Sequence, residues 1–209
     1  MGKHGKARAR ESAKNIRLAK NRNALSRAKI VKSIRKWDDP ILKEVCEPVE
    51  ISEMAQIREL VDLMIKTLKA TKDGVGLAAP QLGVKKNVIV FRTSLNSNDF
   101  SVFINPLLVK NGVNSVTSIE GCLSYPGYTA EVKRYDTVEV TWKDIYGNDK
   151  RQWLDGRSAI IFQHENDHLQ GICAVQKVWE IATGRRQPDD VVQDSNFFSE
   201  NTGSVVPSI

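Results

Sequence analysis

Two histidines four residues apart, His164 and His168, enclose Glu165 and Asp167 in the sequence HENDH. Residues at positions i and i+4 lie on one face of a helix, so both imidazoles can bind one metal ion with Glu165 beside it. A bound metal ion lowers the pKa of a coordinated water, and an adjacent carboxylate can move that water's proton. The spacing therefore predicts a hydrolytic metal site.

The alternative is a chance cluster of polar residues on an exposed helix. The residues just upstream, Ala159–Phe162, are apolar on all sides of a helix and indicate burial. Burying two histidines and two acids is costly unless something specific satisfies them. We therefore favour the metal site.

A catalytic metal of this kind needs a third protein ligand, and Cys122 in the segment Glu120–Ser124 (EGCLS) is the best candidate. Its neighbour Gly121 permits close approach of the backbone, and a thiolate donates more charge than a third imidazole. A lone cysteine is more often a small core residue, and we apply that interpretation to Cys46 and Cys173.

The segment Gly74–Gln81 (GVGLAAPQ) has two glycines and two alanines, which keep side chains away from the backbone. The backbone of a ligand could therefore pair with it, and the Gln81 amide could donate to a developing oxyanion. An ordinary, tightly packed glycine-rich turn is an equally good interpretation of this segment alone. The Lys-Ser/Thr ending of a phosphate-binding P-loop is missing.

Taken together, the three segments resemble the signatures of the peptide deformylase family, and they occur here in the family's order. The resemblance extends from about residue 34 to residue 178. It includes Asp39–Leu42 near its start and Leu169–Gly171 after the histidines. One motif is weak support, but three ordered motifs are highly specific.

The resemblance implies a role for each matched position. The metal ligands would be Cys122, His164 and His168, and Glu165 would be the general acid/base. The amide of Gln81 and the backbone N–H of Leu123 would hold the tetrahedral oxyanion.

Further residues are implied in binding the peptide and in supporting the site. The backbones of Gly121 and of Val75–Gly76 would pair with the peptide. Asp167 would anchor the metal-binding helix through a salt bridge, with Arg134 as its expected partner. A pocket for methionine would be lined by Val75, Ile160, Ile161 and the ring of His164.

The implied reaction is hydrolysis of the formyl group on N-terminal formylmethionine of newly made peptides, which yields formate and a free amine. The implied cofactor is one divalent metal ion per chain, Fe²⁺ in the cell, with Zn²⁺, Ni²⁺ or Co²⁺ as substitutes. Three departures from the family pattern bear on peptide preference. They are Asn166 and Arg157, where apolar residues are usual, and Gly127–Thr129, where many bacterial members place a substrate-contacting arginine.

Two other functions fit part of the sequence. A zinc metallopeptidase also uses a His-Glu-x-x-His helix, and Glu180 is the only plausible downstream ligand of that kind. That interpretation leaves the Cys122 and Gln81 segments unexplained. An RNA-binding protein with an inactive deformylase-like body fits the basic N-terminus, but every catalytic position is present.

The elements expected to position these residues indicate an α+β fold, with antiparallel strands around a central metal-binding helix. Apolar residues at helical spacing predict a surface helix from Ser52, as its N-cap, to about Lys72. The turn at 146–149 predicts a hairpin, and Gly171 ends a mostly buried helix. The expected strands are Val88–Phe91, Val102–Ile104, Thr137–Trp142 and Arg151–Leu154. The buried helix is expected over Ser158–Leu169.

The net charge of +6 conceals two parts of opposite sign. Residues 1–36 contain 13 of the 31 basic residues and one acid, a net charge of +12, so the other 173 residues carry −6. We expect a basic N-terminal extension at 1–33, disordered or bound to a partner, a catalytic domain at 34–186 and a polar tail at 187–209. Residues 1–36 have two interpretations. They contact the ribosome or RNA, or their charges form an ordinary surface that contacts only solvent.

Composition also bears on where the protein acts. No apolar run approaches the length that crosses a bilayer, and three scattered cysteines indicate a reducing compartment. We expect a cytoplasmic monomer without membrane contact. An organelle is the alternative if the basic extension is a transit peptide.

Overall fold

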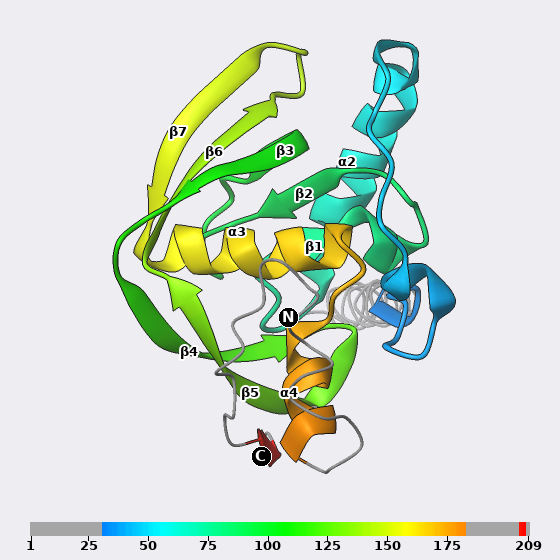
Figure 1. Cartoon of the computed structure of the whole chain (residues 1–209). Helices are drawn as coiled ribbons and strands as arrows, with labels where there is room; N and C mark the ends of the chain where they lie inside the picture. Colours follow the sequence, from blue (N-terminus) through cyan, green and yellow to red (C-terminus); the bar gives the residue numbers. More distant parts are fainter. Residues whose placement is uncertain (1–30, 183–204, 208–209) are drawn as a thin grey trace, which may run out of the picture.

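The computed structural model describes residues 31–182 and 205–207, which form two antiparallel sheets and three α-helices (Figure 1). The five-stranded sheet has the order β1-β2-β3-β6-β7, and the three-stranded sheet has the order β4-β5-β8. The strands of the larger sheet are β1 (Gly76–Ala78), β2 (Val88–Phe91), β3 (Ser101–Asn111), β6 (Thr137–Lys143) and β7 (Asp149–Asp155). Those of the smaller sheet are β4 (Ser115–Cys122), β5 (Tyr125–Tyr135) and β8 (Val205–Pro207), and the helices are α2 (Met54–Ala70), α3 (Gly156–Leu169) and α4 (Ala174–Ala182).

Helix α3 lies between the two sheets, as expected for the metal-binding helix (Figure 1). Its apolar residues, including Ala159, Ile161 and Phe162, are buried against the larger sheet. Because water is excluded from most of its circumference, polar groups on this helix need specific partners. The α+β architecture with antiparallel strands around a central helix is confirmed.

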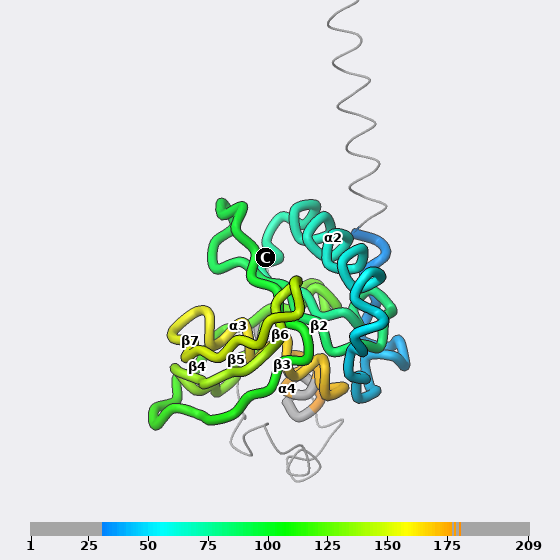
Figure 2. The backbone as a smooth tube through the Cα atoms, turned by 90° about the horizontal axis from the view of Figure 1, so that it is seen from above, coloured from blue at the N-terminus to red at the C-terminus, as the bar shows by residue number. Residues whose placement is uncertain are grey.

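Helix α2 packs against the larger sheet (Figure 2), and Arg58 Nε of this helix donates to the Ile145 carbonyl in the β6–β7 turn at 3.4 Å. Met64 and Leu68 are completely buried on its inner face. The expected start at Ser52 is wrong, because residues Ile51–Glu53 form a 3-10 turn and the α-helix begins at Met54. The backbone N–H of Glu50 donates to the Glu53 carboxylate at 2.8 Å, which stabilises this turn.

The four expected strands are present as β2, β3, β6 and β7, with β3 longer than expected, and the hairpin turn joins β6 to β7. Strands β4 and β5 were not predicted. The burial of β4 is confined to its end, at Glu120 and Cys122, so its sequence lacks the apolar alternation of a half-buried strand.

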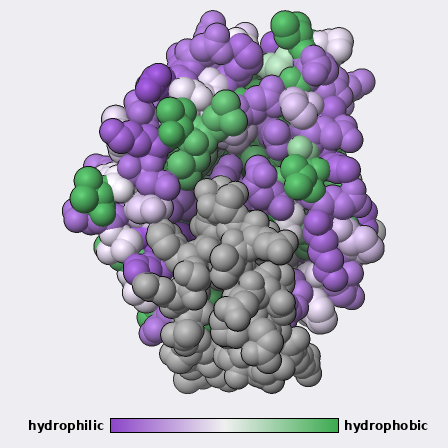
Figure 3. Space-filling view, in the orientation of Figure 1, coloured by the Kyte–Doolittle hydropathy of each residue, from purple (hydrophilic) through white to green (hydrophobic). Residues whose placement is uncertain are grey.

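The expected boundary at 186–187 falls outside the described residues, which exclude 1–30, 183–204 and 208–209. Ile34 is buried, so the folded body includes the expected first residue of the catalytic domain. Val205–Pro207 lie within the expected polar tail but form strand β8, which pairs with Tyr128–Ala130 of β5. Among the described helices, none is long and apolar enough to cross a membrane. The face seen in Figure 3 is mostly hydrophilic, with hydrophobic residues in separate groups.

Candidate metal centre

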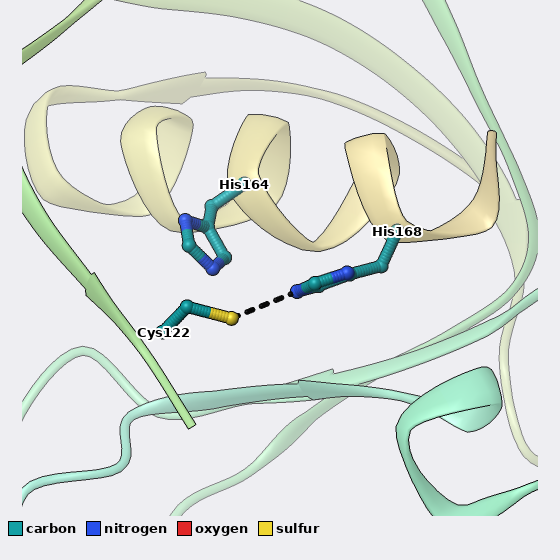
Figure 4. Close-up of side chains that lie close together, drawn as sticks. All are labelled: Cys122, His164 and His168. Atoms are coloured by element: carbon teal, nitrogen blue, oxygen red, sulfur yellow. Dashed lines mark hydrogen bonds between the residues drawn. The ribbon is translucent and has the colours of Figure 1, made fainter. Parts of the chain in front are cut away.

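Cys122, His164 and His168 meet in the space between β4 and α3 (Figure 4). Their ligand atoms all lie within 4.8 Å of one another, and Cys122 Sγ lies 3.2 Å from His168 Nε2. The four-residue spacing turns both imidazoles to one face of α3, while Cys122 is the last residue of β4. One sulfur and two nitrogen donors in a group of this size fit a first-row divalent metal ion.

Cys173 lies beside Cys122, a contact that sequence analysis missed because it treated Cys173 only as a core residue. A hydrogen bond from Cys173 and the neighbouring His168 and His164 hold the pKa of the Cys122 thiol well below its usual value, against the effect of burial. The thiolate is the form that binds metals. The two cysteines are far apart in sequence, and no local pattern pointed to this contact.

Glu120 connects the group formed by Cys122, His164 and His168 to a buried ion-pair network. Its Oε2 lies 2.8 Å from His164 Nδ1, and Arg134 Nε donates to its Oε1 at 2.9 Å. Arg134 Nη1 also donates to Asp167 at 2.6 Å, so the expected pair is in contact. Burial raises the pKa of Glu120, but Arg134 and His164 outweigh it and lower the pKa to about 2.

This network orients the imidazole of His164. A carboxylate on Nδ1 selects the tautomer and directs Nε2 toward the metal position. Glu120 had no predicted role, although it lies two residues before Cys122 in the chain. Residues at i and i+2 of a strand face the same side, but this relation could not be used because β4 was not predicted as a strand.

Glu165 is buried, and its Oε2 has no hydrogen-bond partner among the described residues. Burial raises the pKa of Glu165 to about 7, while the charges of His164 and His168 oppose the rise. A bound cation would act in the same direction as the histidines and favour the carboxylate. An unpaired buried oxygen beside three metal-ligand atoms is poised to exchange protons with a bound molecule.

Gln81 lies across the site from α3. Its Oε1 accepts a hydrogen bond from the Ala78 backbone at 2.8 Å, which orients the side-chain amide. Its Nε2 donates to Ser124 Oγ at 3.1 Å and lies 3.9 Å from Cys122 Sγ. An amide donor is thus held next to the metal ligands, as an oxyanion-stabilising group requires.

The residues that follow the basic extension fasten this side of the site. The Arg35 backbone N–H donates to the Gln81 carbonyl at 2.8 Å, and Lys36 Nζ donates to the Leu123 carbonyl at 3.0 Å. The Trp37 backbone N–H donates to the Ser124 carbonyl at 3.0 Å. These contacts could not be predicted from the sequence, because the residues that they join are far apart in the chain.

A cavity of about 1020 Å³ opens beside the three ligands. Gly76 belongs to β1 and Gly121 to β4, and each strand is at the edge of its sheet, so both can pair with an extended peptide. The cavity wall includes all the residues expected in peptide binding: Val75, Gly76, Gly121, Ile160, Ile161 and the His164 ring.

The three departures from the family pattern occupy different environments. Arg157 and Gly127–Thr129 line the cavity, whereas Asn166 is buried in α3. Glu180, the ligand expected of a zinc peptidase, is hydrogen-bonded to Gln176 Nε2 at 2.6 Å. It does not belong to the group of metal-ligand atoms found among the described residues.

Comparison with known proteins places this architecture in one family. The sequence model of the family described as Polypeptide deformylase matches residues 31–183. A peptide deformylase of Fusobacterium nucleatum is 36% identical over 154 residues, which cover 73% of this chain and 87% of the relative.

Solved structures give the same result. The peptide deformylase of Thermotoga maritima is 32% identical, with a TM-score of 0.64 over 68% of this chain and 94% of that structure. A class I type b peptide deformylase of Acinetobacter baumannii, bound to Met-Ala-Ser, is also 32% identical. Its TM-score is 0.64, and the match covers 68% of this chain and 95% of that one.

Proposed function

Because this chain belongs to the peptide deformylase family, whose members remove the N-formyl group from newly made peptides with the help of a metal ion, we propose that Cys122, His164 and His168 bind its metal and that Glu165 transfers the protons. The observation that carries this assignment is the unpaired, buried Glu165 Oε2 beside three converging ligand atoms. A divalent ion held there supplies Lewis-acid chemistry, which polarises a carbonyl and acidifies a water molecule.

The remaining roles belong to side chains and backbone groups of the chain. The Glu165 carboxylate accepts a proton from the attacking water and delivers it to the nitrogen of the breaking C–N bond. The products are then formate and a peptide with a free N-terminus. The Gln81 amide and the Leu123 N–H donate to the carbonyl oxygen as it gains negative charge. Gly121 and Val75–Gly76 hold the peptide in an extended form, with its methionine against Ile160 and Ile161.

The relative from Acinetobacter baumannii supports a peptide that begins with methionine as the ligand, since its structure is bound to Met-Ala-Ser. The buried Arg134–Asp167 contact supports the proposed structural role of Asp167, because it anchors the last turn of α3. The cavity beside the ligands provides room for such a peptide.

The decisive experiment compares Glu165→Gln with the wild type on a formyl-Met-Ala peptide, measuring formate release. General acid–base transfer contributes on the order of 10²–10⁴-fold, so we expect kcat to fall by that factor while the metal content stays constant. Glu59→Gln on the exposed face of α2 is the matched control. A kcat within about tenfold of the wild type, or ~1.4 kcal/mol of barrier, would reject the assigned role.

We also propose one divalent ion per chain, Fe²⁺ in the cell, with Zn²⁺, Ni²⁺ or Co²⁺ as functional substitutes. The mixed sulfur and nitrogen donors suit all four ions. Protein purified without oxygen should contain close to one equivalent of iron by elemental analysis. Protein with one zinc per chain under the same conditions would instead identify Zn²⁺ as the native ion.

For the basic extension we propose an electrostatic contact with ribosomal RNA, which would bring the enzyme to formylated chains in the cytoplasm. Residues 1–36 contain 13 basic residues, 11 of them in the extension at 1–33, which supports this contact, and such binding weakens steeply with salt. Removal of residues 1–33 should abolish co-sedimentation with ribosomes at low salt. In a second variant, the lysines and arginines of this segment are changed to glutamine. This variant keeps the length of the extension and removes its charge, so it shows which of the two is needed for binding to ribosomes.

Equal co-sedimentation of all three proteins would exclude this contact and favour a transit peptide, and with it an organelle.

We further propose that the enzyme is a monomer. Analytical ultracentrifugation of the full chain tests this, and a sedimenting mass twice that of the chain would exclude it.

A further inference from the structure

The mouth of the active-site cavity carries positive charge. The charged side chains that line the cavity and reach solvent are Lys36, Lys72, Arg157 and a single acid, Asp73. The other two lining acids are buried, and one of them, Glu120, is paired with Arg134. The mouth is therefore cationic, although residues 37–209 as a whole carry −6.

Arg157 differs from the other two cations in its surroundings. Lys36 already donates to the Leu123 carbonyl, whereas Lys72, like Arg157, makes no ion pair among the described residues, but its neighbour in the chain is an acid, Asp73. Arg157 is exposed, and within the described part of the chain its side chain makes no ion pair or hydrogen bond. A guanidinium held at a cavity mouth without a partner can bind a carboxylate of an incoming ligand.

The position of Arg157 on α3 indicates which part of a peptide it can reach. Arg157, Ile160, Ile161 and His164 follow the i, i+3, i+4, i+7 spacing of one helix face, and all four line the cavity. Seven residues of helix place the Cα of Arg157 about 10 Å from that of His164 along the axis. The guanidinium thus lies beyond the apolar wall, on the side away from the metal ligands.

An extended peptide presents alternate side chains to the same side. If methionine 1 of the substrate faces Ile160 and Ile161, as the proposed function requires, then residue 3 faces α3 as well. The two positions are about 7 Å apart, close to the roughly 5–6 Å along the axis of α3 that separates Arg157 from the apolar wall. Residue 2 points away from α3.

We propose that Arg157 is a specificity-determining residue that favours formylated chains with an acidic side chain at their third position. The interaction is an ion pair at the cavity mouth, between the guanidinium and the Asp or Glu carboxylate. It acts on binding and not on the bond-breaking step, because it lies far from the reacting atoms. It should therefore appear in KM more than in kcat.

The test compares three amidated peptides, formyl-Met-Ala-Glu-Ala, formyl-Met-Ala-Gln-Ala and formyl-Met-Ala-Lys-Ala. Amidation removes the terminal carboxylate, which would otherwise add a charge. At low salt we expect kcat/KM for the Glu peptide to exceed that for the Gln peptide by up to about fivefold, the range of an exposed ion pair. The Lys peptide should be the poorest, and the differences should shrink at about 0.5 M salt, because salt screens exposed charges.

Variants then assign the effect to one residue. Arg157→Gln should abolish the preference for Glu over Gln, and Arg157→Glu should reverse it in favour of Lys. The matched control Lys66→Gln, an exposed cation of α2 outside the cavity, should keep the wild-type order. The preference for Glu over Gln should be smaller when the acid is at residue 2, as in formyl-Met-Glu-Ala-Ala, because residue 2 faces away from α3.

The outcomes separate this inference from the proposed function on which it rests. Equal kcat/KM for the three peptides in the wild-type enzyme, or a preference that persists in Arg157→Gln, would overturn the role of Arg157 alone. The wild-type enzyme alone, measured with the three peptides at low and high salt, shows whether the preference for an acidic third residue exists, even if a variant fails to fold. Failure to release formate from any of the peptides would overturn the proposed function as well.

Discussion

The carboxylate of Glu165 lies against Gly76, in the space that a side chain at position 76 would occupy. A Cβ built on Gly76 would lie 2.8 Å from Glu165 Cδ, closer than such atoms approach in proteins. The glycine is therefore required for space, not for an unusual backbone conformation. The edge strand that is proposed to bind the peptide and the proposed general base thus depend on each other's positions.

Gly76→Ala should therefore lower kcat while leaving the three metal ligands in place. Displacing Glu165 removes part of a contribution on the order of 10²–10⁴-fold, so we expect a loss of at least about tenfold. Formate release measures the loss, and elemental analysis should still show one metal ion per chain. Wild-type kcat in this variant would contradict the inferred contact.

Cys122→Ser should reduce metal occupancy and activity together, because a serine hydroxyl is a much weaker ligand than a thiolate. Cys46→Ala is the matched control, since Cys46 is equally buried but lies in a different core cluster, away from the metal ligands. Metal content after dialysis against a weak chelator gives the comparison. Full occupancy and turnover in Cys122→Ser would exclude this cysteine as a ligand.

Arg134→Met should destabilise the protein strongly, since it leaves the carboxylates of Glu120 and Asp167 buried without a partner. Breaking a buried pair in this way costs about 3–5 kcal/mol, which corresponds to a drop in Tm of roughly 6–20 °C. Arg151→Met is the matched control, because Arg151 pairs with Glu139 and its side chain is 62% exposed. In thermal unfolding, the Tm of Arg134→Met should fall much further than the Tm of Arg151→Met. Equal shifts in Tm would show that the buried network does not stabilise the protein more than an exposed ion pair does.

Asp144 should make the β6–β7 hairpin sensitive to acid. The Asn148 side chain and the backbone N–H groups of Asn148 and Tyr146 donate to its carboxylate and lower its pKa to about 2. Because the folded-state pKa lies below the unfolded value of about 3.9, the stabilisation is complete above pH 4 and is lost as the pH falls toward 2. The Tm of the wild type should exceed that of Asp144→Asn at pH 7, with the gap closing below pH 4. A gap that does not depend on pH would reject this assignment.

Much of the site could be predicted from the sequence because it depends on local geometry. His164 and His168 share a helix face wherever that helix lies, and the pattern of apolar residues identified both α2 and α3. The three motifs identified Cys122 and Gln81 through their resemblance to one family. The pairing of Asp167 with Arg134 was implied by the same resemblance, and the structure shows the two side chains in contact.

The tertiary structure decided everything that depends on contacts between distant segments. Glu120 became the link between His164 and Arg134 only when β4 was placed beside α3, and β4 itself was missed because little of it is buried. The contact of Cys173 with Cys122, and the support of Leu123 by Lys36, join residues that no periodicity relates. Periodic patterns report which face of an element is buried, but not which other element covers that face. The partners of a buried polar group are therefore determined only when the chain has packed.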